Sequence, residues 1–137
     1  MQVFLPYPDL KQSVYCLDPS RLGNQIYREA KTLITGGWKN HPASKMWRNY
    51  KPALAQYCLY GLEELTSRGR HYPKWIEFYK EYLTEKITLP PWFGDNRLHS
   101  SHRTALLYKD INWYGKFGWG ESPAIPVNGK LPYYWPL

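Results

Sequence analysis

Cysteines, acidic residues and long apolar runs are all scarce in this sequence, and each shortage narrows the class of protein. The chain has two cysteines, Cys16 and Cys58, and no CxxC pair, which argues against a zinc finger or a disulfide framework. Both lie in apolar segments, so we expect buried free thiols and a reducing compartment. No apolar stretch is long enough to span a membrane, and residues 1–9 lack the pattern of a signal peptide. We therefore expect a cytoplasmic protein that does not bind membranes.

Signatures of several enzyme classes are missing as well. The sequence has no GxSxG nucleophile motif, no GxxxxGK[ST] phosphate loop and no HExxH zinc motif. These absences argue against a serine hydrolase, a nucleotide hydrolase and a metalloprotease. We expect no cofactor and no metal.

Basic and aromatic residues are abundant instead. Lys and Arg number 18 against 11 Asp and Glu, a net charge of +7, which attracts polyanions such as nucleic acid. Aromatic residues make up 18% of the chain, with 7 Trp and 13 Tyr. Many of these rings would fill the core, but aromatic rings interleaved with cations also stack on bases. The composition favours double-stranded DNA as the partner.

Helical spacing predicts a compact, single-domain, all-α protein over residues 1–137, with an extended N-terminal arm and an aromatic C-terminal tail. Prolines keep residues 1–8 extended, and from residue 112 onward Pro, Gly and aromatic residues predict an ordered tail over the core. Start and stop signals predict five helical segments. They run from Asp9 to Cys16, from Asp18-Pro19 to Gly36-Gly37, from His41-Pro42 to Gly69, from Pro73 to Lys86 and from Asp95 to Lys109. We expect Pro52 to break or kink the third of them.

Three polar clusters could carry the chemistry. On the helix after Pro19, Arg21, Gln25 and Glu29 share one face at four-residue spacing. A carboxylate among basic groups suits an acid–base step on bound DNA. The simpler alternative is a solvated helix face with intrahelical ion pairs, which spacing alone favours.

In the second cluster, residues 38–51, cations alternate with aromatic rings. This pattern suits a clamp on the DNA backbone with a stacking platform, and the amides after His41 could meet a phosphate. The alternative is that Trp47 belongs to the core and the cations are merely exposed. We expect a mixture, with Lys45 and Arg48 pointing outward.

The third cluster is the helix after Asp95, where His99 and His102 share a face and Arg103 lies one turn from His99. We rank phosphate or base contact first, structural hydrogen bonding second and metal binding third, because a metal site needs a further ligand.

Six segments together resemble a family of small bacterial and phage proteins, the pyrimidine-dimer DNA glycosylase or endonuclease V-like family. The resemblance covers nearly the whole chain. The segments are MQVFLPYPDL at residues 1–10, LDPSRLGNQ at 17–25, HPASKMWR at 41–48, PPWFGD at 90–95, HSSHR at 99–103 and LPYYWP at 131–136.

The resemblance implies a compact helical enzyme that removes a base and can also cleave the DNA strand. In phage endonuclease V an N-terminal amine attacks the sugar carbon, assisted by a helix carboxylate, and an α-amine of pKa about 7.7–8.0 suits that task. Here Gln at position 2 should prevent removal of Met1, so the nucleophile would be the Met1 amine or an activated water. The carboxylate would be Glu29 or Asp18, and we favour Glu29.

The leading hypothesis is therefore a monomeric DNA glycosylase, with or without lyase activity, that excises a damaged or modified base. A non-catalytic DNA-binding module and a small enzyme acting on modified nucleotides remain as alternatives. Either Trp47 or Trp92 would stack where a base is flipped out. The residues that we expect to contact DNA are Arg21, Gln25, His41, Lys45, Trp47, Arg48, Trp92, His99, His102 and Arg103.

Overall fold

The computed structural model describes residues 2–84 and 86–136, so Met1, a predicted nucleophile, lies outside the described residues. The described part is helical and has an isolated bridge between Val127 and Lys130 but no strand, which confirms the all-α prediction. None of its helices is both long and apolar enough to cross a membrane. The elements are α1 (Leu10–Tyr15), α2 (Pro19–Asn24), the π-helical turn η1 (Gln25–Glu29), α3 (Ala30–Ile34), α4 (Pro42–Trp47), α5 (Lys51–Ser67), α6 (Pro73–Lys80), α7 (Asn96–Lys109), α8 (Ile111–Tyr114) and the 3-10 turn η2 (Gly115–Phe117).

Helix starts follow the predicted caps. The Asp9 carboxylate accepts from the Gln12 amide at 2.8 Å, and the Asp95 carboxylate accepts from the Arg97 amide at 3.0 Å. Asp18 caps α2 in the same way. Each bond satisfies an amide that the first helical turn leaves without a partner, so local sequence is enough to set these helix starts.

The helix from residue 42 is broken near Pro52, as predicted: α4 ends at Trp47, and Pro52 lies in the first turn of α5, where a missing N–H costs nothing. Helix α6 ends at Lys80 and not at Lys86. The tail also contains α8 and η2, although we expected no helix beyond residue 112.

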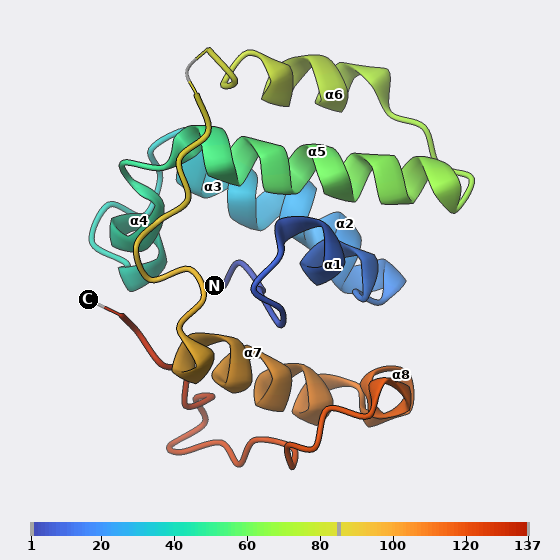
Figure 1. Ribbon diagram of the computed structural model, residues 1–137, viewed down its shortest axis with the longest axis vertical. Helices are drawn as coiled ribbons and strands as arrows, with labels where there is room; N and C mark the ends of the chain where they lie inside the picture. Colours follow the sequence, from blue (N-terminus) through green and yellow to red (C-terminus); the bar gives the residue numbers. More distant parts are fainter. Residues whose placement is uncertain (1, 85, 137) are drawn as a thin grey trace.

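Helix α5 is the centre of the fold (Figure 1). It packs against α1 and α3 on one side and α6 on the other, while α7 and α8 lie at the opposite edge of the molecule. Gly61 of α5 permits a close crossing, because a Cβ there would lie 2.9 Å from the Ile26 side chain. Leu5, Leu22 and Ile26 are among the fully buried residues at the centre.

The tail is ordered, as predicted, and it runs along α7 (Figure 1). The Ala124 amide donates to the Thr104 carbonyl at 2.9 Å, and the Tyr134 amide donates to Ser101 Oγ at 3.2 Å. These bonds bring the end of the chain back to the helix that precedes it. Both cysteines are buried and free, as expected.

Candidate active site

A polar cavity of about 210 Å³ lies where α2, η1, the N-terminal arm, α7 and the tail meet. It brings together residues from both ends of the chain. One carboxylate and two basic side chains are part of its wall. The lining residues are Gln2, Phe4, Ser20, Arg21, Asn24, Gln25, Glu29, Lys109 and Tyr133.

The helix that lines this cavity carries the predicted polar face. Arg21, Gln25 and Glu29 all line it, so the shared face inferred from their spacing is confirmed. The π-helical turn spans Gln25–Glu29, and such turns are frequent at functional sites. The sequence shows no signal for this turn, because neither a proline nor a glycine lies within it.

Glu29 is the carboxylate of the cavity. Its side chain keeps 17% of its surface exposed, so it is sheltered but reachable. Among the described residues its ion-pair partner is Arg28 at 4.0 Å, and that side chain is 76% exposed. An exposed pair at this distance contributes little, so the Glu29 oxygens stay available to a bound molecule.

Lys109 and Arg21 add positive charge around Glu29. Burial lowers the pKa of the Lys109 ammonium and the positive charge of Arg21 lowers it further, while Glu29 and Asp18 oppose that shift. The Lys109 ammonium therefore senses the charges of Arg21, Glu29 and Asp18. The arrangement suits a phosphate beside a carboxylate, because two cations can offset the charge of the phosphate.

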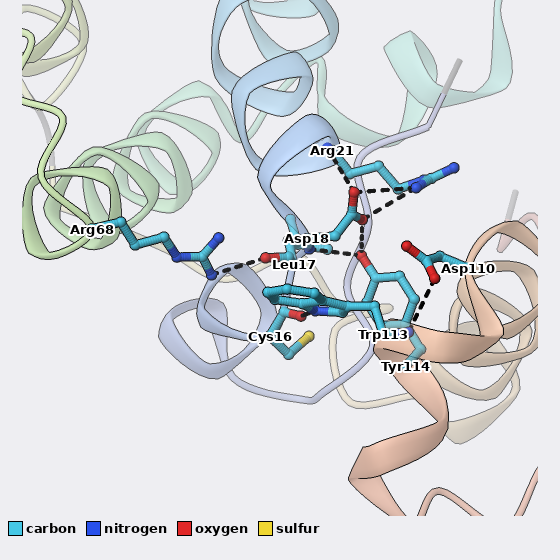
Figure 2. Close-up of polar contacts among 8 residues, drawn as sticks. All are labelled: Cys16, Leu17, Asp18, Arg21, Arg68, Asp110, Trp113 and Tyr114. Atoms are coloured by element: carbon cyan, nitrogen blue, oxygen red, sulfur yellow. Dashed lines mark hydrogen bonds and ion pairs between the residues drawn. The ribbon is translucent and has the colours of Figure 1, made fainter.

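Asp18, the alternative catalytic carboxylate, is used differently (Figure 2). It is 4% exposed and is absent from the cavity lining. Its oxygens accept from Nη1 of Arg21 at 3.2 and 3.3 Å, from the Arg21 amide at 3.4 Å and from the Tyr114 hydroxyl. Burial, followed by this carboxylate, raises the pKa of Tyr114. Asp18 therefore positions Arg21 and joins α2 to α8.

The junction between α1 and α2 is held from two further directions (Figure 2). The guanidinium of Arg68 on α5 donates to the carbonyls of Tyr15 and Leu17 at 3.2 and 2.9 Å. The indole N–H of Trp113 on α8 donates to the Cys16 carbonyl at 2.7 Å. These bonds satisfy carbonyls at the end of α1 and fix the start of the helix that carries Arg21 and Glu29.

The N-terminal arm is extended, and its backbone groups form hydrogen bonds with helix side chains and not with a neighbouring strand. The Gln25 amide oxygen accepts from the Phe4 amide at 2.9 Å, and its NH₂ donates to the Gln2 carbonyl at 3.1 Å. The Tyr57 hydroxyl donates to the Phe4 carbonyl at 2.8 Å. Gln25, expected to contact DNA, therefore anchors the arm at the cavity.

Two histidines of α7 hold the other side of the arm. The Leu5 amide donates to Nδ1 of His102 at 2.8 Å, and Nδ1 of His99 donates to the Leu5 carbonyl at 2.7 Å. Nε2 of His99 accepts from the Gly94 amide at 3.0 Å. Burial lowers the pKa of both rings, that of His102 to about 3, so both are neutral at physiological pH. Structural hydrogen bonding, ranked second for this pair, is the role that the structure places first.

This placement corrects several expected DNA contacts. His99 and His102 are 1% and 0% exposed, and Trp47 and Trp92 are 2% and 8% exposed with their rings in edge contact. Side chains buried in this way cannot stack on a base or reach a phosphate. Arg103 is engaged too, because it donates to the Pro6 carbonyl at 2.8 Å and pairs with Glu121 at 2.6 Å.

The basic segment around α4 is exposed, as predicted. Lys45 and Arg48 point outward, and a second cavity of about 420 Å³ is lined by Lys39, Arg48 and Lys51 with no carboxylate. His41 caps α4 through Nδ1, which accepts from the Ala43 amide at 3.0 Å. Nδ1 of His41 is therefore engaged by the helix cap, while the three cations stay available to phosphates. No cluster of three or more His, Cys, Asp or Glu side chains in the described residues could hold a metal.

Sequence reasoning gave no role to several residues in and around the site. Lys109 and Tyr133 line the cavity, and the hydroxyl of Tyr57 holds the arm beside it. Tyr57 shows no distinguishing signal, because a buried Tyr that binds backbone has the same spacing as one that only packs. Lys109 and Tyr133 reach the cavity through the return of the tail, which no local pattern indicates.

The model of a family described as pyrimidine dimer DNA glycosylase matches residues 1–79, which is more than half of the chain. The match includes the arm, α2, η1 and Glu29, whereas Lys109 and Tyr133 lie beyond it. No curated protein and no solved structure matches the chain.

Proposed function

The chain belongs to the pyrimidine dimer DNA glycosylase family, and from this premise we propose that it excises a damaged base from double-stranded DNA with Glu29 as its catalytic carboxylate. The observation that carries the proposal is the cavity in which Glu29 lies with Arg21 and Lys109. A damaged nucleotide flipped out of the duplex would place its sugar against Glu29 and its flanking phosphates against the two cations. Because one chain supplies every lining group, the active form in this proposal is a monomer.

Glu29 has a defined task in this reaction. When the bond between sugar and base breaks, its electron pair leaves with the base and positive charge develops on the sugar. A carboxylate beside that carbon stabilises the charge and orients or deprotonates the attacking group. Arg21 serves the same reaction by holding phosphate, and Asp18 keeps it in place.

The attacking group is either the amine of Met1 or a water molecule, and we propose the amine. Support comes from the arm, since Gln2 lines the cavity and its carbonyl is bound by Gln25. Attack by an amine on the sugar carbon releases the base and gives a Schiff base after ring opening. Elimination of the 3′ phosphate would then follow, and that is the lyase activity.

Glu29→Gln is the test of the carboxylate. We expect base release to fall by about 100- to 1,000-fold, while affinity for the duplex stays within about threefold of wild type. Glu77→Gln, an exposed carboxylate on α6, is the matched control and should leave both unchanged. Equal loss of binding and base release in Glu29→Gln would refute the catalytic role, and unchanged base release would favour Asp18.

Borohydride trapping tests the nucleophile. Ultraviolet-damaged, abasic and undamaged duplexes are compared, using protein with a free and with a blocked N-terminus. An adduct lost on blocking establishes the Met1 amine, and the damaged duplex that forms it identifies the substrate. Base release without an adduct establishes water as the nucleophile. If the protein binds DNA tightly and in a salt-sensitive way but forms no adduct and releases no base, it is a non-catalytic DNA-binding module.

A further inference from the structure

One of the most exposed aromatic side chains lies in a turn between two helices. Trp38, in the turn between α3 and α4, is 58% exposed, whereas the rings first expected to stack on bases are buried. An exposed indole gains little from burial, so its packing does not explain its position.

The backbone at Trp38 is also unfavourable. Its φ is +56°, in the left-handed region that glycine adopts freely and bulky residues avoid. The other described non-glycine residue with positive φ is Asn128, a residue type that tolerates this conformation. The turn is closed by the His41 amide, which donates to the Trp38 carbonyl at 2.9 Å. The local fold therefore holds a strained residue with its ring toward solvent.

A row of rings joins Trp38 to the Glu29 cavity. Trp38 meets His41 edge-on at 5.6 Å between centroids, His41 meets Trp135 at 5.7 Å, and Trp135 meets Tyr133 at 5.8 Å. Tyr133 lines the cavity. Together these centroid distances place the Trp38 ring no farther from Tyr133 than the length of about five base pairs, since a duplex rises about 3.4 Å per base pair.

Positive charge surrounds the same turn. The next residue, Lys39, lines the cationic cavity together with Arg48 and Lys51. An exposed indole beside three cations matches the combination that binds nucleic acid, in which cations hold phosphates and rings stack on bases.

From this geometry we propose that Trp38 stacks on a DNA base within about five base pairs of the nucleotide that enters the Glu29 cavity. The inference rests on the proposed function, because it takes that cavity as the place where the damaged nucleotide binds. Phosphates flanking the stacked base would lie on Lys39, Arg48 and Lys51.

Trp38→Gly is the informative variant, because it removes the ring and relieves the backbone. Binding to labelled duplexes, ultraviolet-damaged and undamaged, is measured by fluorescence anisotropy at several salt concentrations. We expect Kd for the damaged duplex to rise about 5- to 150-fold, the range for loss of one base–aromatic stack. The dependence of log Kd on log salt should not change, since no phosphate contact is lost. Tm should equal or exceed that of wild type.

Three companion variants sharpen the test. Trp38→Tyr should restore binding to within about threefold, because tyrosine also stacks. Tyr108→Ala removes another ring that is more than half exposed and should bind as wild type does. Lys39→Ala, in contrast, should reduce the salt dependence by about one phosphate contact.

The inference is overturned if Trp38→Gly binds as tightly as wild type, if its salt dependence falls, or if affinity is lost together with Tm. Its failure is distinct from failure of the proposed function. Glu29→Gln tests base release without touching Trp38, and the Trp38 variants are read by binding alone.

Discussion

The hydrogen bond between the Leu5 amide and His102 makes the position of the arm sensitive to acid. Nδ1 of His102 accepts that amide at 2.8 Å and can do so only while it carries no proton. Because burial lowers the pKa of His102 from 6.5 to about 3, the folded state binds its proton more weakly than the unfolded chain does. Acid should therefore unfold the protein or release the arm.

Proton linkage gives the direction and the size of this loss of stability in acid. The stability that a neutral His102 provides is complete above the unfolded pKa of 6.5 and is lost as the pH falls toward the folded pKa of about 3. Each pKa unit corresponds to about 1.4 kcal/mol, so lowering the pH from 7 to 5 should reduce the free energy of unfolding by about 2 kcal/mol. The pKa of His99 is also lowered by burial, so His99 adds to the loss with the same sign.

Denaturant unfolding at pH 7, 6 and 5 measures this loss directly. In His102→Asn the amide oxygen can accept from Leu5 but does not titrate, so the decline between pH 7 and pH 5 should be smaller than in wild type by about 2 kcal/mol. His71→Asn removes an exposed imidazole and should leave the decline unchanged. The reasoning is refuted if His102→Asn declines as steeply as wild type, or if wild type is equally stable at pH 7 and pH 5.

Two substitutions test how the site is supported. Gln25→Leu keeps the side-chain volume but leaves the Phe4 amide and the Gln2 carbonyl without their partner. The free energy of unfolding should fall by about 3 kcal/mol, and the Phe4 amide hydrogen should exchange faster with solvent. Unchanged exchange would contradict the anchoring role. Asp18→Asn retains a helix cap but loses the charge that holds Arg21. The free energy of unfolding should fall by about 2 kcal/mol, and DNA affinity should fall severalfold. Full stability with no base release would instead identify Asp18 as the catalytic carboxylate.

Local sequence determined the elements whose cause lies within one or two turns of helix. Asp9, Asp18 and Asp95 start helices because each carboxylate reaches an amide two or three residues ahead. The face shared by Arg21 and Glu29 was predictable for the same reason, since it depends on the helical repeat.

Tertiary structure decided what each face meets. His99 and His102 have the same spacing whether they face DNA or the arm, and only the packing of α7 against the arm turns them inward. The arm carries no strand partner, so its backbone is satisfied by side chains from distant helices. Lys109 joins Glu29 only because the chain folds back on itself. Such contacts depend on which surfaces are buried together, and the spacing of residues within a helix does not contain that information.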